Sequence, residues 1–536
     1  MTAKTLITIG LSSLYFAITS VAGELPKKIE LTKDQLYDKI RGGWAGKFIG
    51  CTYGGPTEFK FNYKIIPDGE KINWQQFALN NRINGVLGSL YDDLYVGITF
   101  MSVYEKFGLN APRKEFKKAL AESNFQLWCA NLKARINYFD GNIDPNVPTS
   151  WRNNSRSDDI DFQIESDYAG LMSPANVKSA LKFAEVAGKA INASDGYYCG
   201  AYIASMCSLA FALDNPQDVV EYASKILPKE SITYAVVNDI IAHYKENKTD
   251  WKLAWKTFHD KYIPQSKGGI YAPYNLAYVV IGLLYGNGDF DKTADISTRC
   301  GLDSDCNPST ACGILAIISG YSNLPEKWRK YIEPVEKTHY FRGTNYTLEK
   351  TYSTGYMHAL NVLKSNGVNI FKEKLEIDVV LPDALPYEKN GFEFGTVKNP
   401  RIPKVFEKYI ESGAIAGYLN ISREKLPAIT KENPVVEIEF EGTGVAIYNT
   451  DTPTHHKNMS KKWHIKGNCA TVEVFLDGKK QIDANYSFEE HRFRRDWLYE
   501  VYDLPHGKHK VKLVLKNAHK QFPPLHQTVA TFRNLK

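Results

Sequence analysis

The sequence predicts two domains, a largely α-helical one followed by an all-β sandwich of jelly-roll type. The chain has 536 residues, whereas a single hydrophobic core stops growing at roughly 250–300 residues. No convincing strand pattern precedes about residue 375, and after Phe371 the helical pattern gives way to period-two alternation of apolar and polar residues. We therefore expect a processing segment at 1–23, a helical domain at 24–370 and a β-sandwich at 371–536.

The first residues have the pattern of an export signal. Lys4 supplies a positive charge, residues 6–18 are apolar, and residues 20–23 are small, as at a cleavage site. The apolar run is shorter than the roughly 20 residues that span a bilayer, which disfavours the alternative of a membrane anchor. The apolar stretch 276–285 is shorter still and predicts a buried helix. We expect a secreted or periplasmic protein with no membrane span in the mature chain.

Composition excludes some classes of protein. The formal net charge of +6 is weak for this length, and the one basic run, 455–466, is short. Nucleic-acid binding needs a concentrated basic face, so we expect no nucleic-acid partner. The eight cysteines lack the paired spacing of zinc sites, and three of them recur every six residues, at 300, 306 and 312. Small buried thiols are the favoured interpretation.

The first predicted helix begins after Thr32, which forms a capping-box pattern with Gln35. Its apolar residues recur every four positions and should face a core: Leu36, Ile40, Trp44 and Phe48. Glycines at 42, 43, 46 and 50 would cost helix stability unless something packs very close. That neighbour is either another helix or a ligand.

Further helices are predicted by the same spacing. They cover 93–107, 177–191, 201–213, 216–226, 232–244, 251–262 and 309–319. In the second half, alternation predicts strands around Val436 to Phe440, around 471–476 before the turn pair Asp477-Gly478, and around Val511 to Leu515.

Two acidic clusters stand far apart in the sequence. Asp92 and Asp93 open one predicted helix, and Asp303 and Asp305 lie just before another. Carboxylates at a helix N-terminus can be simple caps, which is the alternative for the first pair. Alternate carboxylates in a glycine-containing turn can point at one centre, and four oxygen ligands from two turns suit a hard cation such as Mg²⁺ or Ca²⁺.

Several segments occur in the order that is typical of one family. They are the glycine-rich helix from Gly43 to Gly50, the segment 55–59, the Asp92-Asp93 pair, the segment 170–174, and the turn 301–305 with a small-residue helix behind it. Over roughly residues 30–340 the chain resembles the ADP-ribosylglycohydrolase family. The resemblance implies an all-α bundle with a two-metal centre in a central cleft.

The resemblance implies that Asp92, Asp93, Asp303 and Asp305 are metal ligands. It implies one or two Mg²⁺ ions, with Ca²⁺ or Mn²⁺ as alternatives. Two positions depart from the family pattern, in which Thr or Ser commonly precedes the first Asp pair and follows the second. This chain has Tyr91 and Cys306 there. Because a thiol is a poor ligand for Mg²⁺, the site could hold a single ion or a different one.

Other candidates concern proton transfer and substrate. Glu58 matches a Glu that some family members place against the scissile ribose, with a surface-loop residue as the alternative. The acidic run 157–167 would usually be solvated, but Asp161 and Glu165 share one helix face, as an acid–base pair could. Asp195, Gly196 and Tyr197 resemble a cleft-lining, substrate-binding loop of the family, and packing is an equally good explanation for Tyr197.

These observations predict a secreted, metal-dependent hydrolase of N- or O-glycosidic bonds. Its substrate would be a small molecule or a glycan, and we expect a furanosidic sugar in a glycan or a nucleoside-type compound, since export argues against an intracellular task. The phrases 440–445, 474–478 and 504–509 resemble galactose-binding-like modules, so the sandwich is a candidate carbohydrate-binding domain. The alternative is a catalytically decayed carbohydrate- or ligand-binding protein.

Overall fold

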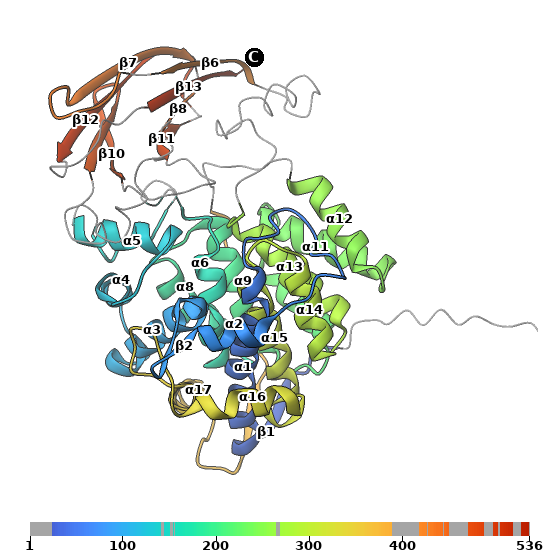
Figure 1. Cartoon of the computed structure of the whole chain (residues 1–536). Coiled ribbons are helices and arrows are strands. Elements are labelled where there is room, and N and C mark those ends of the chain that lie inside the picture. Colours follow the sequence, from blue (N-terminus) through green and yellow to red (C-terminus); the bar gives the residue numbers. More distant parts are fainter. Residues whose placement is uncertain are drawn as a thin grey trace, which may run out of the picture.

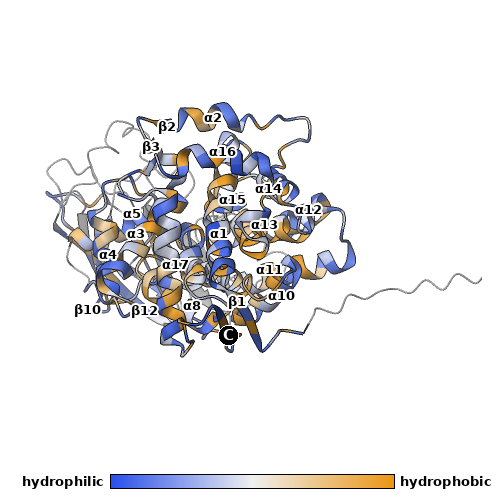
Figure 2. Cartoon of the chain, turned by 90° about the horizontal axis from the view of Figure 1, so that it is seen from below, coloured by the Kyte–Doolittle hydropathy of each residue, from blue (hydrophilic) through white to orange (hydrophobic). Residues whose placement is uncertain are grey.

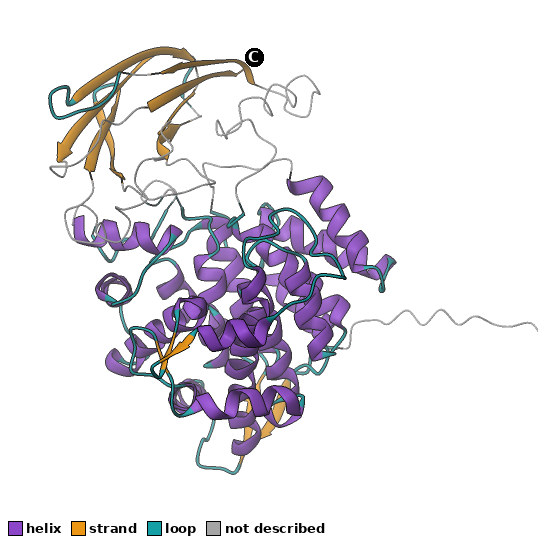
Figure 3. Cartoon of the chain, in the orientation of Figure 1, coloured by secondary structure: helices purple, strands orange, loops and turns teal. Residues whose placement is uncertain are grey.

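In the computed structural model, helices form one body and the C-terminal strands a second (Figure 1). The structure describes residues 24–140, 144–150, 154, 156–263, 269–388, 418–425, 427–442, 444–449, 470–486, 497–501, 504–517 and 527–534. Figure 3 shows the helices gathered in one body together with a few short strands, and the other strands gathered in the second body. The predicted export signal at 1–23 and the basic run at 455–466 lie outside the described residues.

Helix α1 (Lys33–Gly54) confirms the capping prediction. The Gln35 amide donates to Thr32 Oγ1 over 3.1 Å, and the Thr32 amide donates to Gln35 Oε1 over 2.8 Å. The predicted apolar stripe of the helix is fully buried. α1 therefore runs through the centre of the helical body rather than along its surface.

The other predicted helices are all present, and the largest shift of a boundary is that of α9, which begins at Ser194 rather than at 201. The helices are α2 (Trp74–Asn80), α3 (Asp92–Phe107), α4 (Arg113–Glu122), α5 (Cys129–Asp140), α6 (Asp161–Glu165), α7 (Asp167–Leu171), α8 (Val177–Gly188), α9 (Ser194–Leu209), α10 (Pro216–Ala223), α11 (Ile232–Glu246), α12 (Trp251–Tyr262), α13 (Ala272–Gly286), α14 (Phe290–Arg299), α15 (Cys306–Ser319), α16 (Glu326–Glu336) and α17 (Leu348–Ser365).

The interior of the helical body is apolar and continuous. Every residue of α13 is buried, which confirms the prediction of a buried helix at 276–285. Peripheral helices such as α14 and α16 carry both hydrophilic and hydrophobic residues (Figure 2). None of the helices among the described residues has the length and apolar character needed to cross a membrane.

Short strands also belong to the helical body. β1 (Lys28–Thr32) pairs antiparallel with β5 (Lys374–Asp378), and β2 (Arg82–Ile83), β3 (Val86–Leu87) and β4 (Tyr340–Phe341) form a small sheet. Leu375 and Ile377 of β5 are buried in the helical core. The first domain thus continues past the expected boundary at 370, because the segment after α17 returns to close the core.

The C-terminal strands form two four-stranded sheets. One has the order β10 (Lys479–Tyr486), β9 (Ala470–Leu476), β12 (Gly507–Asn517), β7 (Val435–Gly442), and the other the order β11 (Trp497–Val501), β8 (Gly444–Asn449), β13 (Gln527–Asn534), β6 (Tyr418–Lys425). All pairs are antiparallel. Alternate residues of β7 are buried, as the sequence pattern predicts. The jelly-roll connection of these strands stays a prediction.

Candidate metal centre

The site is built on the contact between α1 and α15. A Cβ atom added at Gly46 would lie 2.4 Å from the carbonyl oxygen of Cys312, and one at Gly50 would lie 2.2 Å from the carbonyl oxygen of Pro308. At Gly54 it would lie 1.8 Å from the carbonyl oxygen of Ser304. Of the two explanations for the glycine-rich helix, a neighbouring helix is therefore correct. The close approach brings the start of α15 against the end of α1.

The turn that precedes α15 presents the second acidic pair. Gly301 and Leu302 both have positive φ, +86° and +57°, a conformation that costs energy for leucine. The backbone around Phe59 and Phe61 holds this turn, since the Phe59 amide donates to the Leu302 carbonyl over 3.0 Å and the Leu302 amide to the Phe61 carbonyl over 3.3 Å. Asp303 and Asp305 follow directly and are buried.

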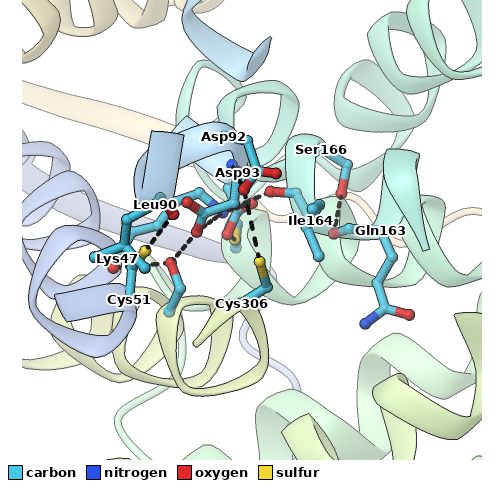
Figure 4. A network of polar contacts seen from close by, with 12 residues as sticks. Lys47, Cys51, Leu90, Asp92, Asp93, Gln163, Ile164, Ser166 and Cys306 are labelled. Carbon is cyan, nitrogen blue, oxygen red and sulfur yellow. Dashed lines mark hydrogen bonds and ion pairs between the residues drawn. The ribbon is translucent and has the colours of Figure 1, made fainter. Parts of the chain in front are cut away.

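The first acidic pair lies at the start of α3, next to a buried lysine (Figure 4). Asp93 is fully buried and accepts a short hydrogen bond from the Ser309 hydroxyl of α15. Lys47 Nζ of α1 lies 3.6 Å from Asp93 Oδ2 and 2.8 Å from Asp167 Oδ2, and it donates to the Ile164 carbonyl over 2.7 Å. The Asp93 amide donates to Asp92 Oδ1 over 3.0 Å.

Burial and mutual repulsion act on the acidic groups. Burial raises the pKa of Asp93 to about 6, although Lys47 and the Ser309 hydroxyl lower it. Burial, and then repulsion from Asp93 and Glu58, raise the pKa of Asp92 well above its usual range. Burial likewise raises the pKa values of Asp303 and Asp305. Four carboxyl groups in this surrounding are more stable when a cation is present.

The residues present fit a divalent cation. Among the described residues, the Oδ1 atoms of Asp93, Asp303 and Asp305 are buried and accept no hydrogen bond. Ligand atoms of Asp92, Asp93 and Cys306 lie within 4.8 Å of one another, as do those of Asp303, Asp305 and Cys306. Buried carboxylate oxygens without partners are costly, and coordination of a cation removes that cost.

Glu58 lies at the outer edge of this cluster. It follows the short 3₁₀ turn η1 (Gly55–Thr57). Thr57 Oγ1 of this turn lies 2.9 Å from Ser304 Oγ, which ties the segment to the turn that carries Asp303. The residue is solvent-exposed, yet desolvation by its surroundings and repulsion from Asp303 and Asp93 raise its pKa to about 7. At such a pKa, the protonated form of Glu58, which can donate a proton, and the deprotonated form, which can accept one, are both populated at neutral pH.

Asp161 and Glu165 share a helix face, as predicted, but they are buried rather than solvated. Asp161 accepts from the backbone amides of Ala130 and Asn131 over 3.1 and 3.0 Å, at the start of α5. Glu165 accepts a short hydrogen bond from the Asn131 side chain, and burial followed by repulsion from Asp161 raises its pKa. The acidic run 157–167 is buried because its carboxylates find partners there: Asp161 binds the start of α5, and Asp167 binds the ammonium group of Lys47.

The proposed substrate loop is the first turn of a helix. Asp195, Gly196 and Tyr197 lie in α9 and are buried. Asp195 Oδ1 accepts from the amide and the hydroxyl of Thr233, both over 2.9 Å, near the start of α11. The Tyr197 ring is 2% exposed and stacks on Phe162, with 6.3 Å between the ring centroids. Packing is therefore the better explanation for these three residues.

Sequence reasoning missed several residues of the centre. Lys47 lies in the glycine-rich, largely apolar second half of α1, and Ser309 lies in the small-residue helix α15, so neither residue gives a signal of its own. Tyr91 does not face the acidic groups in the way that a ligand would: its ring stacks on Phe48 at 4.7 Å and its hydroxyl lies 3.1 Å from Thr52 Oγ1. The Cys306 thiol does reach the acidic groups.

The fold and this site define a helical protein with a buried acidic centre between α1, α3 and α15 whose side chains fit a cation. The profile of the family described as ADP-ribosylglycohydrolase matches residues 32–352, which is more than half of the chain. The chain belongs to the ADP-ribosylglycohydrolase family, and its helical fold is that of the family, as the sequence predicted. No curated protein is significantly similar in sequence to this chain.

One similar solved structure is described as an ADP-ribosylglycohydrolase-related protein complex. It is 12% identical in sequence, with a TM-score of 0.43, and the match covers 61% of this chain and 99% of that chain.

Proposed function

We propose that this protein is a secreted, metal-dependent hydrolase of glycosidic bonds. Membership of a family of hydrolases supports the reaction class. The observation that carries the proposal is the convergence of Asp92, Asp93, Asp303 and Asp305, with buried oxygens that accept no hydrogen bond from the described residues. The export-signal pattern at 1–23 supports a place outside the cytoplasm.

The four aspartates would hold the cation. A cation at this place supplies Lewis-acid chemistry that polarises sugar hydroxyl groups. Carboxylate oxygens alone favour Mg²⁺, with Ca²⁺ or Mn²⁺ as alternatives. Asp93 is fixed by Ser309 and Lys47, so at least one carboxylate of the set is already positioned before a cation binds.

Glu58 is the residue best placed to move a proton. It is the exposed acidic group beside the buried aspartates, and its raised pKa suits proton transfer to or from the atom bonded to the anomeric carbon. Asp161 is a weaker candidate, because both of its oxygens accept backbone hydrogen bonds. Glu165 is buried beneath α3 and bound by Asn131.

We propose a furanosidic sugar as the group that is cleaved, in a glycan or a nucleoside-type compound, and the C-terminal jelly-roll sandwich as the part that holds a glycan. The test incubates the mature protein and a divalent cation with ADP-ribosyl-arginine and with aryl arabinofuranosides. We expect release of the aryl group, loss of that activity in Asp305→Asn, and no loss in the surface control Asp260→Asn. Turnover of ADP-ribosyl-arginine alone would contradict the glycan substrate.

A second candidate function is a ligand-binding protein whose catalytic centre has decayed. The replacement of the expected hydroxyl residues by Tyr91 and Cys306 favours it. Binding of a cation without turnover of any glycoside would establish this alternative, whereas hydrolysis that depends on Asp305 would exclude it.

A further inference from the structure

Cys306 occupies a special place in the acidic centre. It is the first residue of α15, immediately after Asp305, and it is 3% exposed. Its sulfur is the ligand atom that both acidic groups share, since Asp92 with Asp93 and Asp303 with Asp305 each lie within 4.8 Å of it. Sγ is 4.0 Å from Asp92 Oδ1 (Figure 4). The thiol thus lies at the junction of the two halves of the centre.

The thiol also has apolar neighbours. Ile160 and Ile164 pack with Cys306 in a small cluster of their own, next to Ile270. These side chains help to bury Cys306, while carboxylate oxygens of both acidic pairs lie within 4.8 Å of its sulfur. A ligand that enters the centre meets sulfur and oxygen atoms together.

The protein places a lysine beside one acidic pair, Asp92 and Asp93, but not beside the other, Asp303 and Asp305, within the described residues. Lys47 is committed to Asp167, to Asp93 and to the Ile164 carbonyl. Within the described part of the chain, no lysine or arginine forms an ion pair with Asp303 or Asp305, whose Oδ1 atoms accept no hydrogen bond. The half formed by Asp303 and Asp305, which follows directly into Cys306, is therefore the half that most needs a cation.

The donor set limits which cation this is. Mg²⁺ requires oxygen ligands in a near-octahedral arrangement and binds sulfur poorly, whereas first-row transition-metal cations accept thiolate together with carboxylate. We propose that Cys306 is a metal ligand and that it makes the centre select a first-row transition-metal dication over Mg²⁺. This inference rests on the metal centre of the proposed function. As the metal–sulfur bond forms, the thiol proton passes to solvent.

The experiment uses the full-length mature chain, stripped of metal and titrated with Co²⁺, which has a sulfur-to-metal absorption band when a thiolate coordinates it. We expect the band in the wild type and in Cys312→Ser, a control that removes a buried thiol six residues further along α15. Cys306→Ser should still bind Co²⁺ but lack the band. Competition with Mg²⁺ should show that the preference of the wild type for Zn²⁺ falls at least tenfold in Cys306→Ser.

The outcomes separate this inference from the proposed function. Bound Co²⁺ without a sulfur band in the wild type, or a band that persists in Cys306→Ser, would overturn the role of Cys306 and leave the metal centre standing. Absence of any bound cation would overturn both. If Cys306→Ser fails to fold, X-ray absorption of the Zn²⁺-loaded wild type decides the matter, since a sulfur neighbour at about 2.3 Å is expected and oxygen neighbours alone would contradict it.

Discussion

The helical body and the C-terminal sheets handle charge in opposite ways. In the helical body, Lys47, Asp93 and Asp167 are buried together. On the sheets, pairs such as Lys480 with Glu473 and Lys510 with Glu437 lie at the surface, over 2.7 Å each. Buried charge is costly unless it is paired, whereas surface pairs contribute little. The comparison teaches that the acidic centre is maintained at a cost in stability, as expected of a functional site.

Removal of the buried ammonium group should have the largest effect. Lys47→Met leaves Asp167 and Asp93 without their cation, and we expect a loss of about 3–5 kcal/mol in the free energy of unfolding. Chemical denaturation of the metal-stripped protein measures this loss. Lys480→Met on the sheet surface is the matched control and should cost no more than about 1 kcal/mol. Equal losses of stability in Lys47→Met and Lys480→Met would contradict the difference between buried and surface ion pairs.

The contact between α1 and α15 should be the next most sensitive feature. Gly50→Ala places a methyl group against the Pro308 carbonyl, which is backbone and cannot rotate away. We expect a loss of about 1–3 kcal/mol and weaker cation binding, because the helices must separate. Gly69→Ala is the matched control, since no atom lies within 4 Å of the added Cβ there. Thermal unfolding and calorimetric titration with a cation measure the two effects. Unchanged stability and cation affinity in Gly50→Ala would show that α1 and α15 can separate without loss.

A smaller effect distinguishes structural from catalytic carboxylates. Asp161→Ala removes the acceptor of two amides at the start of α5, and we expect a loss of about 1 kcal/mol with most of the turnover retained. Glu58→Gln should do the reverse, with stability unchanged and turnover greatly reduced. Denaturation and steady-state kinetics on both variants test the pair of roles. Abolished turnover in Asp161→Ala at normal stability would restore Asp161 as an acid–base residue.

The smallest effect concerns the C-terminal sheets and pH. His509 is desolvated, which lowers its pKa, but hydrogen bonds to Asp477 and to the Pro505 carbonyl raise it above the ordinary value of 6.5. The stability that protonated His509 contributes is therefore complete below pH 6.5, and it is lost as the pH rises through the higher pKa of His509 in the folded protein. The pKa of Asp477 is lowered mainly by His509 against a desolvation cost, so its contribution is lost as pH falls below 3.8.

Hydrogen exchange of β9 and β12 against pH measures this effect. Protection should be greatest between about pH 4 and 6.5 and should decline above it by no more than about 1 kcal/mol. In His509→Gln the decline at higher pH should disappear. A wild-type profile that is flat between pH 6 and 8 would rule out the contribution of the ion pair.

Much of the fold could be predicted because its signals are local. The capping box at Thr32, the apolar stripe of α1 and the alternation in β7 each depend on residues a few positions apart. The small sheet of β2, β3 and β4 was missed, since strands of two residues carry no periodicity. The return of β5 to β1 was missed because their pairing joins residues more than 300 positions apart.

The centre was predicted in part, for a related reason. Asp92, Asp93, Asp303 and Asp305 could be found because acidic pairs beside glycine and helix starts are visible in the sequence. The burial of 157–167 could not be found, since it depends on partners such as Asn131 and the start of α5. Charge patterns alone do not distinguish a solvated acidic run from one that caps buried helices.

The contact between α1 and α15 also limits which positions of the chain can accept a larger side chain. Backbone contact along Gly42, Gly46, Gly50 and Gly54 leaves no room for a larger side chain, and an insertion in either helix would shift these glycines out of register. Positions along this contact are therefore constrained by the backbone of the facing segment, whereas a position such as Gly69, where no atom lies within 4 Å of an added Cβ, can accept a larger residue.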